Sequence, residues 1–437
     1  MRAVSFVEKV EFNFPGNICK NAIVLGDVDN DDNNELVVGN INGELAVFRY
    51  QQPTPWATSH DLGMITTTVV GDILNEGKNF LVTISNEGWC HIFDVKKDMT
   101  MSEERRNLIS FHTQRLPANT KTAVIADIDG DGSMELILGL TDRVLRTYRW
   151  ARIPQSLNTV EEPLGKLVGL HKWEFATQIG SISLNPVVEG CPDVIVAQPG
   201  GAYIRLDCTF PENEEISEDE KVTLVSKLTP EHHPLALSRI RNSNVSTEIV
   251  GGIKGIRDNH VTDNLIAVAT LDGTLMLVDG DNILWSIQVD HQLFALTKLD
   301  MTGDGLDEVV VCAWDGQTYF VNQEQQSVRY QFEEPVCAFT AGYFSLRPGC
   351  KVTCLVYATF RDHIYLYYNV KLQTIQTQKF LDVMAQNPTV SSLISKHGLE
   401  DNTVLREFYH WLLYGFPNSP ANVHLANSPT KSKDEKS

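Results

Sequence analysis

Three short stretches decide the fold: Gly26-Asp27-Val28-Asp29-Asn30-Asp31, Glu35-Leu36-Val37-Val38-Gly39 and Gly43-Glu44-Leu45-Ala46-Val47-Phe48. An apolar segment runs into an acidic turn, a second apolar segment leaves the turn, and a glycine turn returns a third. Short apolar runs that are separated by clusters of Gly, Asp and Asn predict strands joined by tight turns. We interpret this unit as one blade of a β-propeller, provided that it recurs along the chain.

The unit does recur. Counting the second strand of each copy gives seven copies, and these strands begin at residues 35, 80, 135, 193, 265, 308 and 353. We therefore predict an all-β fold, a seven-bladed β-propeller of FG-GAP-like repeats over residues 1–378. Closing the blades into a ring removes the exposed sheet edges that an open array would present. Residues 3–13 largely alternate polar and apolar residues, and we expect them to close the ring as the outer strand of blade seven.

Two polar insertions and a C-terminal extension interrupt or follow the repeats. Residues 95–118 are expected to form a surface loop, and residues 207–235 contain an acidic run that we expect to be disordered. The pattern changes to a helical period in residues 379–415, a predicted helical segment. Pro388–Lys396 forms one expected helix, and a second carries an apolar stripe of Val404, Leu405, Phe408, Trp411 and Leu412. Residues 416–437 are predicted to be a disordered tail.

Charge and composition argue against several classes of protein. The 437-residue chain has 56 acidic and 36 basic residues, a net charge of -20, which opposes general affinity for nucleic acid or anionic lipid. Eight cysteines are too few for a disulfide scaffold. The N-terminal residues do not read as a signal peptide, and no apolar run approaches the roughly 20 residues that span a bilayer. We expect a cytoplasmic protein with no nucleic-acid partner and no direct membrane insertion.

The acidic turns are the candidate metal sites. Three of them share one spacing, with oxygen-bearing side chains at positions one, three, five and nine: Asp27, Asp29, Asp31 and Glu35; Asp127, Asp129, Asp131 and Glu135; Asp300, Thr302, Asp304 and Glu308. Side chains at this spacing in a tight loop can converge on Ca²⁺, which takes six to eight oxygen ligands. The alternative is that the carboxylates accept backbone N–H bonds and hold the turn without a metal. The sequence leaves both open.

No catalytic motif stands out. The chain has no G-x-S-x-G elbow and no H-E-x-x-H pair, and its nearest approach to a phosphate loop, Gly71 to Lys78, has the wrong spacing. The dipeptide Trp314-Asp315 is the only one of its kind and falls on a predicted turn, so it does not indicate a WD40 protein. We predict that the protein is not an enzyme and needs no cofactor beyond the calcium that the turns could hold.

The Gly-Asp-x-Asp-x-Asp turn followed by Glu-Leu-Val-Val-Gly resembles the FG-GAP repeat of integrin α-subunit propellers, whose related loops bind calcium. The resemblance is strongest to an intracellular family with FG-GAP repeats, over Gly26 to Gly39, Pro117 to Arg149 and Leu284 to Tyr319.

This resemblance implies a non-enzymatic scaffold subunit of the KICSTOR assembly on lysosomes. There the family member pairs with kaptin and other subunits, and the assembly recruits the GATOR complex to restrain mTOR signalling when amino acids or glucose are short. The alternative is a stand-alone propeller with a calcium-dependent ligand site. The family motif carries no catalytic residues, and it places no partner-binding residues in this chain.

Overall fold

The computed structural model describes residues 2–98, 107–153, 165–187, 190–208, 230–235, 244–257, 260–372, 387–396 and 401–414. The chain divides into two compact units, residues 1–375 and 376–437. Among the described residues, the first unit contains all the strands and two short helical segments, Val95–Asp98 and Pro199–Gly201, and the second contains two helices.

The strands of the described residues form six hydrogen-bonded sheets. The eight-stranded sheet is β10 (His112–Arg115), β9 (Trp89–Phe93), β8 (Phe80–Ser85), β7 (Ile65–Gly71), β3 (Ile18–Gly26), β4 (Glu35–Asn40), β5 (Leu45–Phe48) and β6 (Ala57–Ser59). Three four-stranded sheets follow: β11 (Thr120–Ala126), β12 (Glu135–Leu140), β13 (Val144–Arg152) and β14 (Gly165–Glu174); β15 (Ile182–Asn185), β16 (Asp193–Ala197), β17 (Tyr203–Leu206) and β18 (Glu231–His233); β19 (Thr247–Arg257), β20 (His260–Thr270), β21 (Thr274–Asp279) and β22 (Asn282–Gln288).

The last two sheets both recruit the N-terminus. One is β1 (Arg2–Ala3), β26 (Ser327–Gln331), β25 (Gln317–Val321), β24 (Glu308–Ala313) and β23 (Leu293–Leu299); the other is β2 (Lys9–Asn13), β29 (His363–Tyr368), β28 (Cys350–Thr359) and β27 (Val336–Arg347). The predicted strand over residues 3–13 is thus divided in two. β1 pairs parallel to β26, and β2 supplies the outer strand of the sheet formed by β27–β29.

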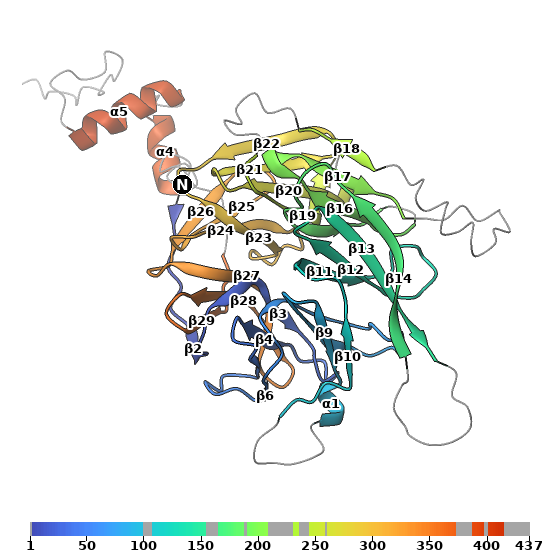
Figure 1. Cartoon of the computed structure of the whole chain (residues 1–437). Helices are drawn as coiled ribbons and strands as arrows, with labels where there is room; N and C mark the ends of the chain where they lie inside the picture. Colours follow the sequence, from blue (N-terminus) through green and yellow to red (C-terminus); the bar gives the residue numbers. More distant parts are fainter. Residues whose placement is uncertain are drawn as a thin grey trace, which may run out of the picture. The chain divides into compact units, whose positions relative to one another are not determined.

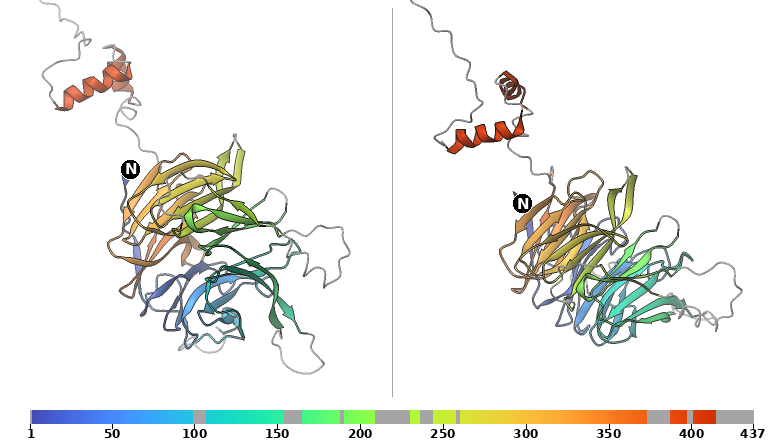
Figure 2. Two further views of the ribbon diagram at one scale, coloured as in Figure 1. Left: turned by 45° about the horizontal axis from the view of Figure 1, so that its top comes forward. Right: turned by 90° about the horizontal axis from the view of Figure 1, so that it is seen from above.

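The sheets follow one another around a ring, in colour order from blue to orange (Figures 1 and 2). Each inner strand packs beside the next, from β3 through β7, β11, β15, β19 and β23 to β27, and β27 packs against β3. The prediction of a propeller is confirmed, but the prediction of seven separate blades is corrected. Five sheets of four or five strands stand apart as blades, whereas the first two repeats share the eight-stranded sheet. They are joined by a single parallel bridge between Asn21 and Thr67.

Apolar clusters between neighbouring sheets hold the ring together. The second strands β4, β8, β12 and β24 are buried along their whole length. The glycine that ends the Glu-Leu-Val-Val-Gly motif permits close approach of the next repeat, because a Cβ on Gly39 would lie 2.6 Å from the Ile65 side chain. Gly139 makes the same approach to Ile182. One buried cluster joins β3–β6 to the last sheet, because Phe48 on β5 belongs to the same cluster as Phe12 on β2 and Phe344 on β27, so it closes the ring.

An ion pair also links strands that are not neighbours. The Lys20 ammonium on β3 contacts the Glu248 carboxylate on β19. Lys121 on β11 donates from Nζ to the carbonyl of Ile179 at 3.0 Å. Burial lowers the pKa of Lys121, and Glu248 partly offsets this effect. These charges connect separate sheets across the interior of the ring.

Both predicted insertions contain structure that the sequence did not indicate. Residues 95–118 include helix α1 (Val95–Asp98) and the outer strand β10, and residues 207–235 include the outer strand β18. Outer strands are exposed, so their sequences are polar and lack the apolar signal of inner strands. Residues 99–106 and 209–229 lie outside the described residues, and the whole acidic run is among them.

The second unit has the two predicted helices, α4 (Pro388–Lys396) and α5 (Asn402–Tyr414). Leu405 is buried within α5, and the rings of Phe408 and Trp411 lie 6.0 Å apart on its surface. The prediction of C-terminal helices is confirmed. The predicted tail, residues 416–437, lies outside the described residues.

Candidate metal centres in the acidic turns

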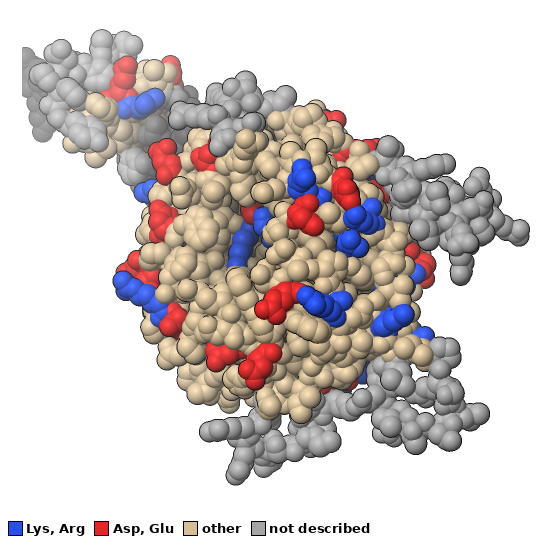
Figure 3. Space-filling model, in the orientation of Figure 1, with Lys and Arg blue, Asp and Glu red and all other residues tan. Residues whose placement is uncertain are grey.

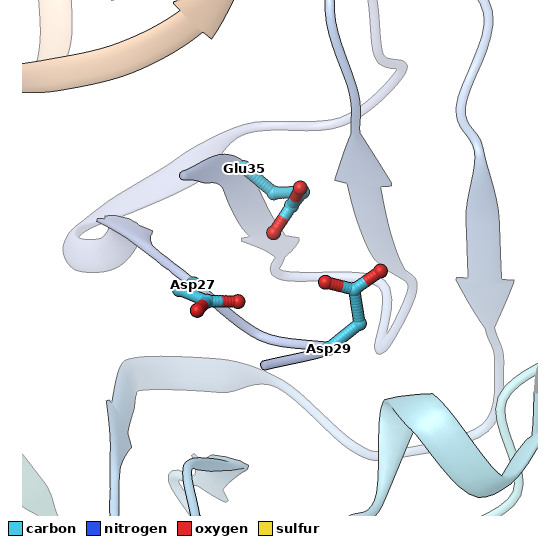
Figure 4. A group of neighbouring side chains, drawn as sticks. All are labelled: Asp27, Asp29 and Glu35. Atoms are coloured by element: carbon cyan, nitrogen blue, oxygen red, sulfur yellow. The ribbon is translucent and has the colours of Figure 1, made fainter. Parts of the chain in front are cut away.

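The first acidic turn connects β3 to β4, and Figure 4 shows three of its carboxylates, Asp27, Asp29 and Glu35. Backbone N–H groups of the turn donate hydrogen bonds to its carboxylates. The Asp27 carboxylate accepts the N–H groups of Asp31 and Asp32 at 3.1 and 2.9 Å. Glu35 Oε2 accepts the N–H of Val28 at 3.2 Å. Asn30 and Asp32 adopt positive φ angles of 60° and 64°, a region that Asn and Asp tolerate better than other side chains. The carboxylates therefore build the turn itself.

An arginine fills the space between the remaining carboxylate oxygens. Arg49 follows β5, and its Nη1 lies 3.1 Å from Asp29 Oδ2 while its Nη2 contacts Asp31 Oδ2. Its Nε is 3.4 Å from Glu35 Oε1. One guanidinium thus lies against three carboxylates of the turn, and two of them, Asp29 and Glu35, belong to the group that could hold a cation.

The turn between β11 and β12 repeats this arrangement with shorter contacts. Arg149 on β13 pairs in register with Glu135. Its Nε donates to Glu135 Oε1 at 2.7 Å, its Nη1 to Asp131 Oδ2 at 2.6 Å and its Nη2 to Asp129 Oδ2 at 2.8 Å. The Asp127 carboxylate accepts the N–H groups of Gly130 and Gly132, as Asp27 does in the first turn.

The turn between β23 and β24 keeps the backbone bonds and lacks the arginine. Asp300 accepts the N–H groups of Gly303 and Gly305 at 2.6 and 3.0 Å, and Glu308 Oε2 accepts that of Met301 at 2.7 Å. Thr302 Oγ1 donates to Glu308 Oε1 at 3.4 Å, and Asp304 Oδ1 accepts the N–H of Leu306. The residue equivalent to Arg49 is Asn322, whose Oδ1 accepts the N–H groups of Glu324 and Gln326. This turn has only three carboxylates, Asp300, Asp304 and Glu308, and no guanidinium of the described residues contacts them.

Burial raises the pKa of the innermost glutamate in each turn. The pKa rises to about 8 for Glu35 and to about 7 for Glu135 and Glu308. In each case burial is the main cause, and a backbone N–H hydrogen bond to the carboxylate partly offsets the rise. Such groups need a cation or a proton to remain inside the protein.

The fit to calcium differs among the turns. Among the described residues, oxygens within 4.8 Å of one another come from Asp27, Asp29 and Glu35 in the first turn and from Asp127, Asp129 and Glu135 in the second of these turns. Asp29 Oδ1 and Glu35 Oε1 are buried without a hydrogen-bond partner, which leaves acceptors that a metal could use. In the second turn Arg149 donates hydrogen bonds to Asp129 and Glu135 of this group, and among the described residues none of its buried carboxylate oxygens lacks a hydrogen-bond partner. The donor set therefore suits Ca²⁺ best in the first turn, in competition with Arg49.

Arg49 and Arg149 are the residues that the sequence analysis missed. Each lies 22 positions after the first aspartate of its turn, and Asn322 stands at the same offset from Asp300. The signal was present, because both turns with three aspartates carry Arg there. It was overlooked because the arginine belongs to the third strand, outside the acidic loop.

The surface in Figure 3 carries its charge in small groups. Lys and Arg atoms lie mostly beside Asp and Glu atoms, including a group in the hollow at the middle of the ring, so the described part of this face has no broad cationic area. None of the described helices has both the length and the apolar character needed to cross a membrane.

Fold and turns together define an FG-GAP-type β-propeller. The chain belongs to the family described as integrin-alpha FG-GAP repeat-containing protein 2, whose family model matches residues 49–372. It is 41% identical over 440 residues to a mouse protein named KICSTOR complex protein ITFG2, with 96% of this chain and 97% of the mouse protein covered. A bovine protein of the same name is 40% identical over 415 residues, with 90% and 76% covered.

Solved structures with low sequence identity share the fold. BBS1N in complex with ARL6DN matches in two crystals, soaked with lead and with mercury, with TM-scores of 0.56 and 0.58 at 13% identity; each covers 86% of this chain and all of BBS1N. Raptor from Chaetomium thermophilum matches with a TM-score of 0.54 at 13% identity, over 83% of this chain and 28% of Raptor. These similarities show the propeller fold alone.

Proposed function

We propose that this protein is a non-enzymatic scaffold subunit of a KICSTOR complex. The observation that carries the proposal is the 41% identity, over nearly the full length of both chains, to a protein with that name. The fold agrees, because a closed ring with buried inner strands offers broad and rigid surfaces for protein partners.

The finer role follows from the same resemblance. The subunit pairs with kaptin, acts in the cytoplasm and at the lysosomal surface through the complex, and helps to recruit GATOR so that mTOR signalling falls when amino acids or glucose are short. The acidic turns serve as structural elements in this role, since Arg49 and Arg149 already neutralise two of them. Calcium is not required for partner binding.

The test is affinity purification of the tagged full chain from cells, with and without EGTA, followed by mass spectrometry. We expect kaptin and the other KICSTOR subunits in both conditions. Recovery that disappears with EGTA would favour the alternative, a stand-alone propeller with a calcium-dependent ligand site. The observation behind it is that Asp29 Oδ1 and Glu35 Oε1 are buried and accept no hydrogen bond. Recovery of no partner in either condition would refute the assembly role.

Helix α5 supplies one partner contact in this proposal. Phe408 and Trp411 are only partly buried and lie on one side of the helix. Replacing both with Asp is expected to abolish recovery of a partner and to leave the melting temperature of the propeller unchanged. Asp at the exposed positions Arg406 and His410 is the matched control. Loss of the folded propeller in the Phe408 and Trp411 variant would assign the stripe to packing within the chain.

A further inference from the structure

Three aromatic rings stack into a column that reaches the surface of the propeller. The rings of Phe294 and Trp314 are 4.4 Å apart with planes 26° from parallel, and those of Trp314 and Phe360 are 6.2 Å apart and 19° from parallel. Phe294 is 4% exposed, whereas Trp314 is 38% and Phe360 50% exposed. The column is thus anchored at one end and open to solvent at the other.

The backbone fixes this column in place. Trp314 lies in the turn between β24 and β25; its N–H donates to the carbonyl of Gln292 at 3.2 Å, and its own carbonyl accepts the N–H of Val336 at 2.9 Å. Val336 pairs with Thr359, the residue before Phe360. Phe294 is the extra residue at a bulge in β23, between Leu293 and Ala295. An exposed surface that is already rigid loses little conformational entropy when it binds a partner.

Exposed carboxylates lie in the chain segments that carry and hold the column. Asp290 and Glu333 are in the connections before β23 and β27, two and three residues before Gln292 and Val336, which hydrogen-bond to Trp314, and both are exposed. Asp315 and Asp362, also exposed, follow Trp314 and Phe360 in their turns. On the basic side are Arg361, which is exposed, and His291, whose Nδ1 lies 2.6 Å from Asp315 Oδ2. Four carboxylates against one guanidinium leave this rim acidic.

We propose that the column Phe294–Trp314–Phe360 with its acidic rim is a docking surface for a partner polypeptide segment that carries Lys or Arg beside an apolar or aromatic side chain. The proposal rests on the role as an assembly subunit, and it places one contact of that assembly on the propeller. Tryptophan and other large aromatic side chains dominate binding energy at protein interfaces. A cationic side chain beside an exposed indole is attracted by the face of the ring and by the negative charge of the carboxylates.

Site-specific photocrosslinking in the full-length chain tests this surface. Phe360→p-benzoylphenylalanine places the photoreactive group on the column, and Tyr343→p-benzoylphenylalanine is the control. Tyr343 is 46% exposed and lies on β27, seven residues after Val336, the residue that pairs with Thr359 next to Phe360. It is therefore an exposed aromatic residue away from the column. We expect position 360 to crosslink to a segment with an excess of Lys and Arg, as identified by mass spectrometry, and position 343 to give no such product.

A second variant tests the rim. Replacing Asp290 and Glu333 together with Lys should reduce the crosslink at position 360 by about tenfold or more, since like charges facing each other are costly at an interface. The melting temperature should stay unchanged, because both side chains are exposed. A crosslink to an acidic segment, to lipid or to a second copy of the chain, no crosslink above the control, or a yield that the charge reversal does not alter would each overturn the proposal. The assembly role itself is tested separately by the affinity purification described above. That role fails if the unmodified tagged chain recovers no KICSTOR subunit.

Discussion

Arg149 is predicted to act as the built-in cation of its turn, and replacing it with Met tests this role. Methionine keeps the apolar stem of the side chain and removes the guanidinium. The change leaves Asp129 and Glu135 without their countercharge, and their side chains are only 10% and 1% exposed. Asp131 is 44% exposed, so water can solvate its carboxylate when the ion pair with Arg149 is lost.

The expected cost follows from this burial. Removing one partner of a buried ion pair costs about 3–5 kcal/mol. We expect about 3 kcal/mol, the lower end, because burial already raises the pKa of Glu135 to about 7 and a proton can replace the lost charge. Vacated oxygens within 4.8 Å of one another should then accept a divalent ion, so calcium should restore part of the lost stability.

Urea unfolding of both proteins, with 1 mM EGTA or with roughly millimolar CaCl₂, measures this effect. The midpoint of Arg149→Met should fall in EGTA, and calcium should raise it by more than it raises the wild-type midpoint, because only the variant has an acidic turn emptied of its guanidinium. Arg152→Met, on the same strand with a side chain 64% exposed, is the control and should change stability by less than about 0.5 kcal/mol. A variant as stable as the wild type, or equal stabilisation of both proteins by calcium, would refute the account of Arg149.

Three further predictions concern stability. Deleting residues 1–13 should lower the melting temperature, because β2 supplies the outer strand of the last sheet; an unchanged melting temperature would contradict this closure of the ring. Phe12→Ala should cost about 3–5 kcal/mol in urea unfolding, since its side chain is fully buried, whereas Val7→Ala, at 86% exposed, should change little. Burial lowers the pKa of His91, so the unfolded state binds more protons than the folded state below about pH 6.5. The free energy of unfolding should therefore decrease as the pH is lowered through this range, by at most about 1.4 kcal/mol per pH unit for this group. His91→Gln should reduce that slope.

The sequence predicted those parts of the fold that carry a local apolar signal. The second strands were found because their buried parts are apolar on both faces, and the predicted first residues Glu35, Phe80, Glu135, Asp193 and Glu308 are the observed ones. The other two, predicted from residues 265 and 353, begin earlier, at His260 and Cys350, because their first residues are largely exposed. Outer strands such as β10 and β18 were missed, since their exposed side chains leave no apolar pattern. Joining of the first two repeats into one sheet depends on a single bridge between distant strands, which no local pattern encodes.

The candidate sites show the same division. The acidic turns were recognisable because their carboxylates lie within nine residues and fold back on their own backbone. The arginines that neutralise them were not recognisable, because Arg49 follows β5 and Arg149 lies on β13, outside the acidic loops. The aromatic column joins residues from β23 and two turns, and only the ring brings these together. Trp314 looked like an isolated turn residue in the sequence.

The central claim is that this chain acts as a subunit that binds its partners without calcium. Co-expression with kaptin, followed by size-exclusion chromatography with light scattering in the presence of EGTA, tests it most directly. The account predicts one peak with the summed mass of both chains. Separate elution of the two proteins in EGTA, with co-elution only when calcium is added, would contradict it.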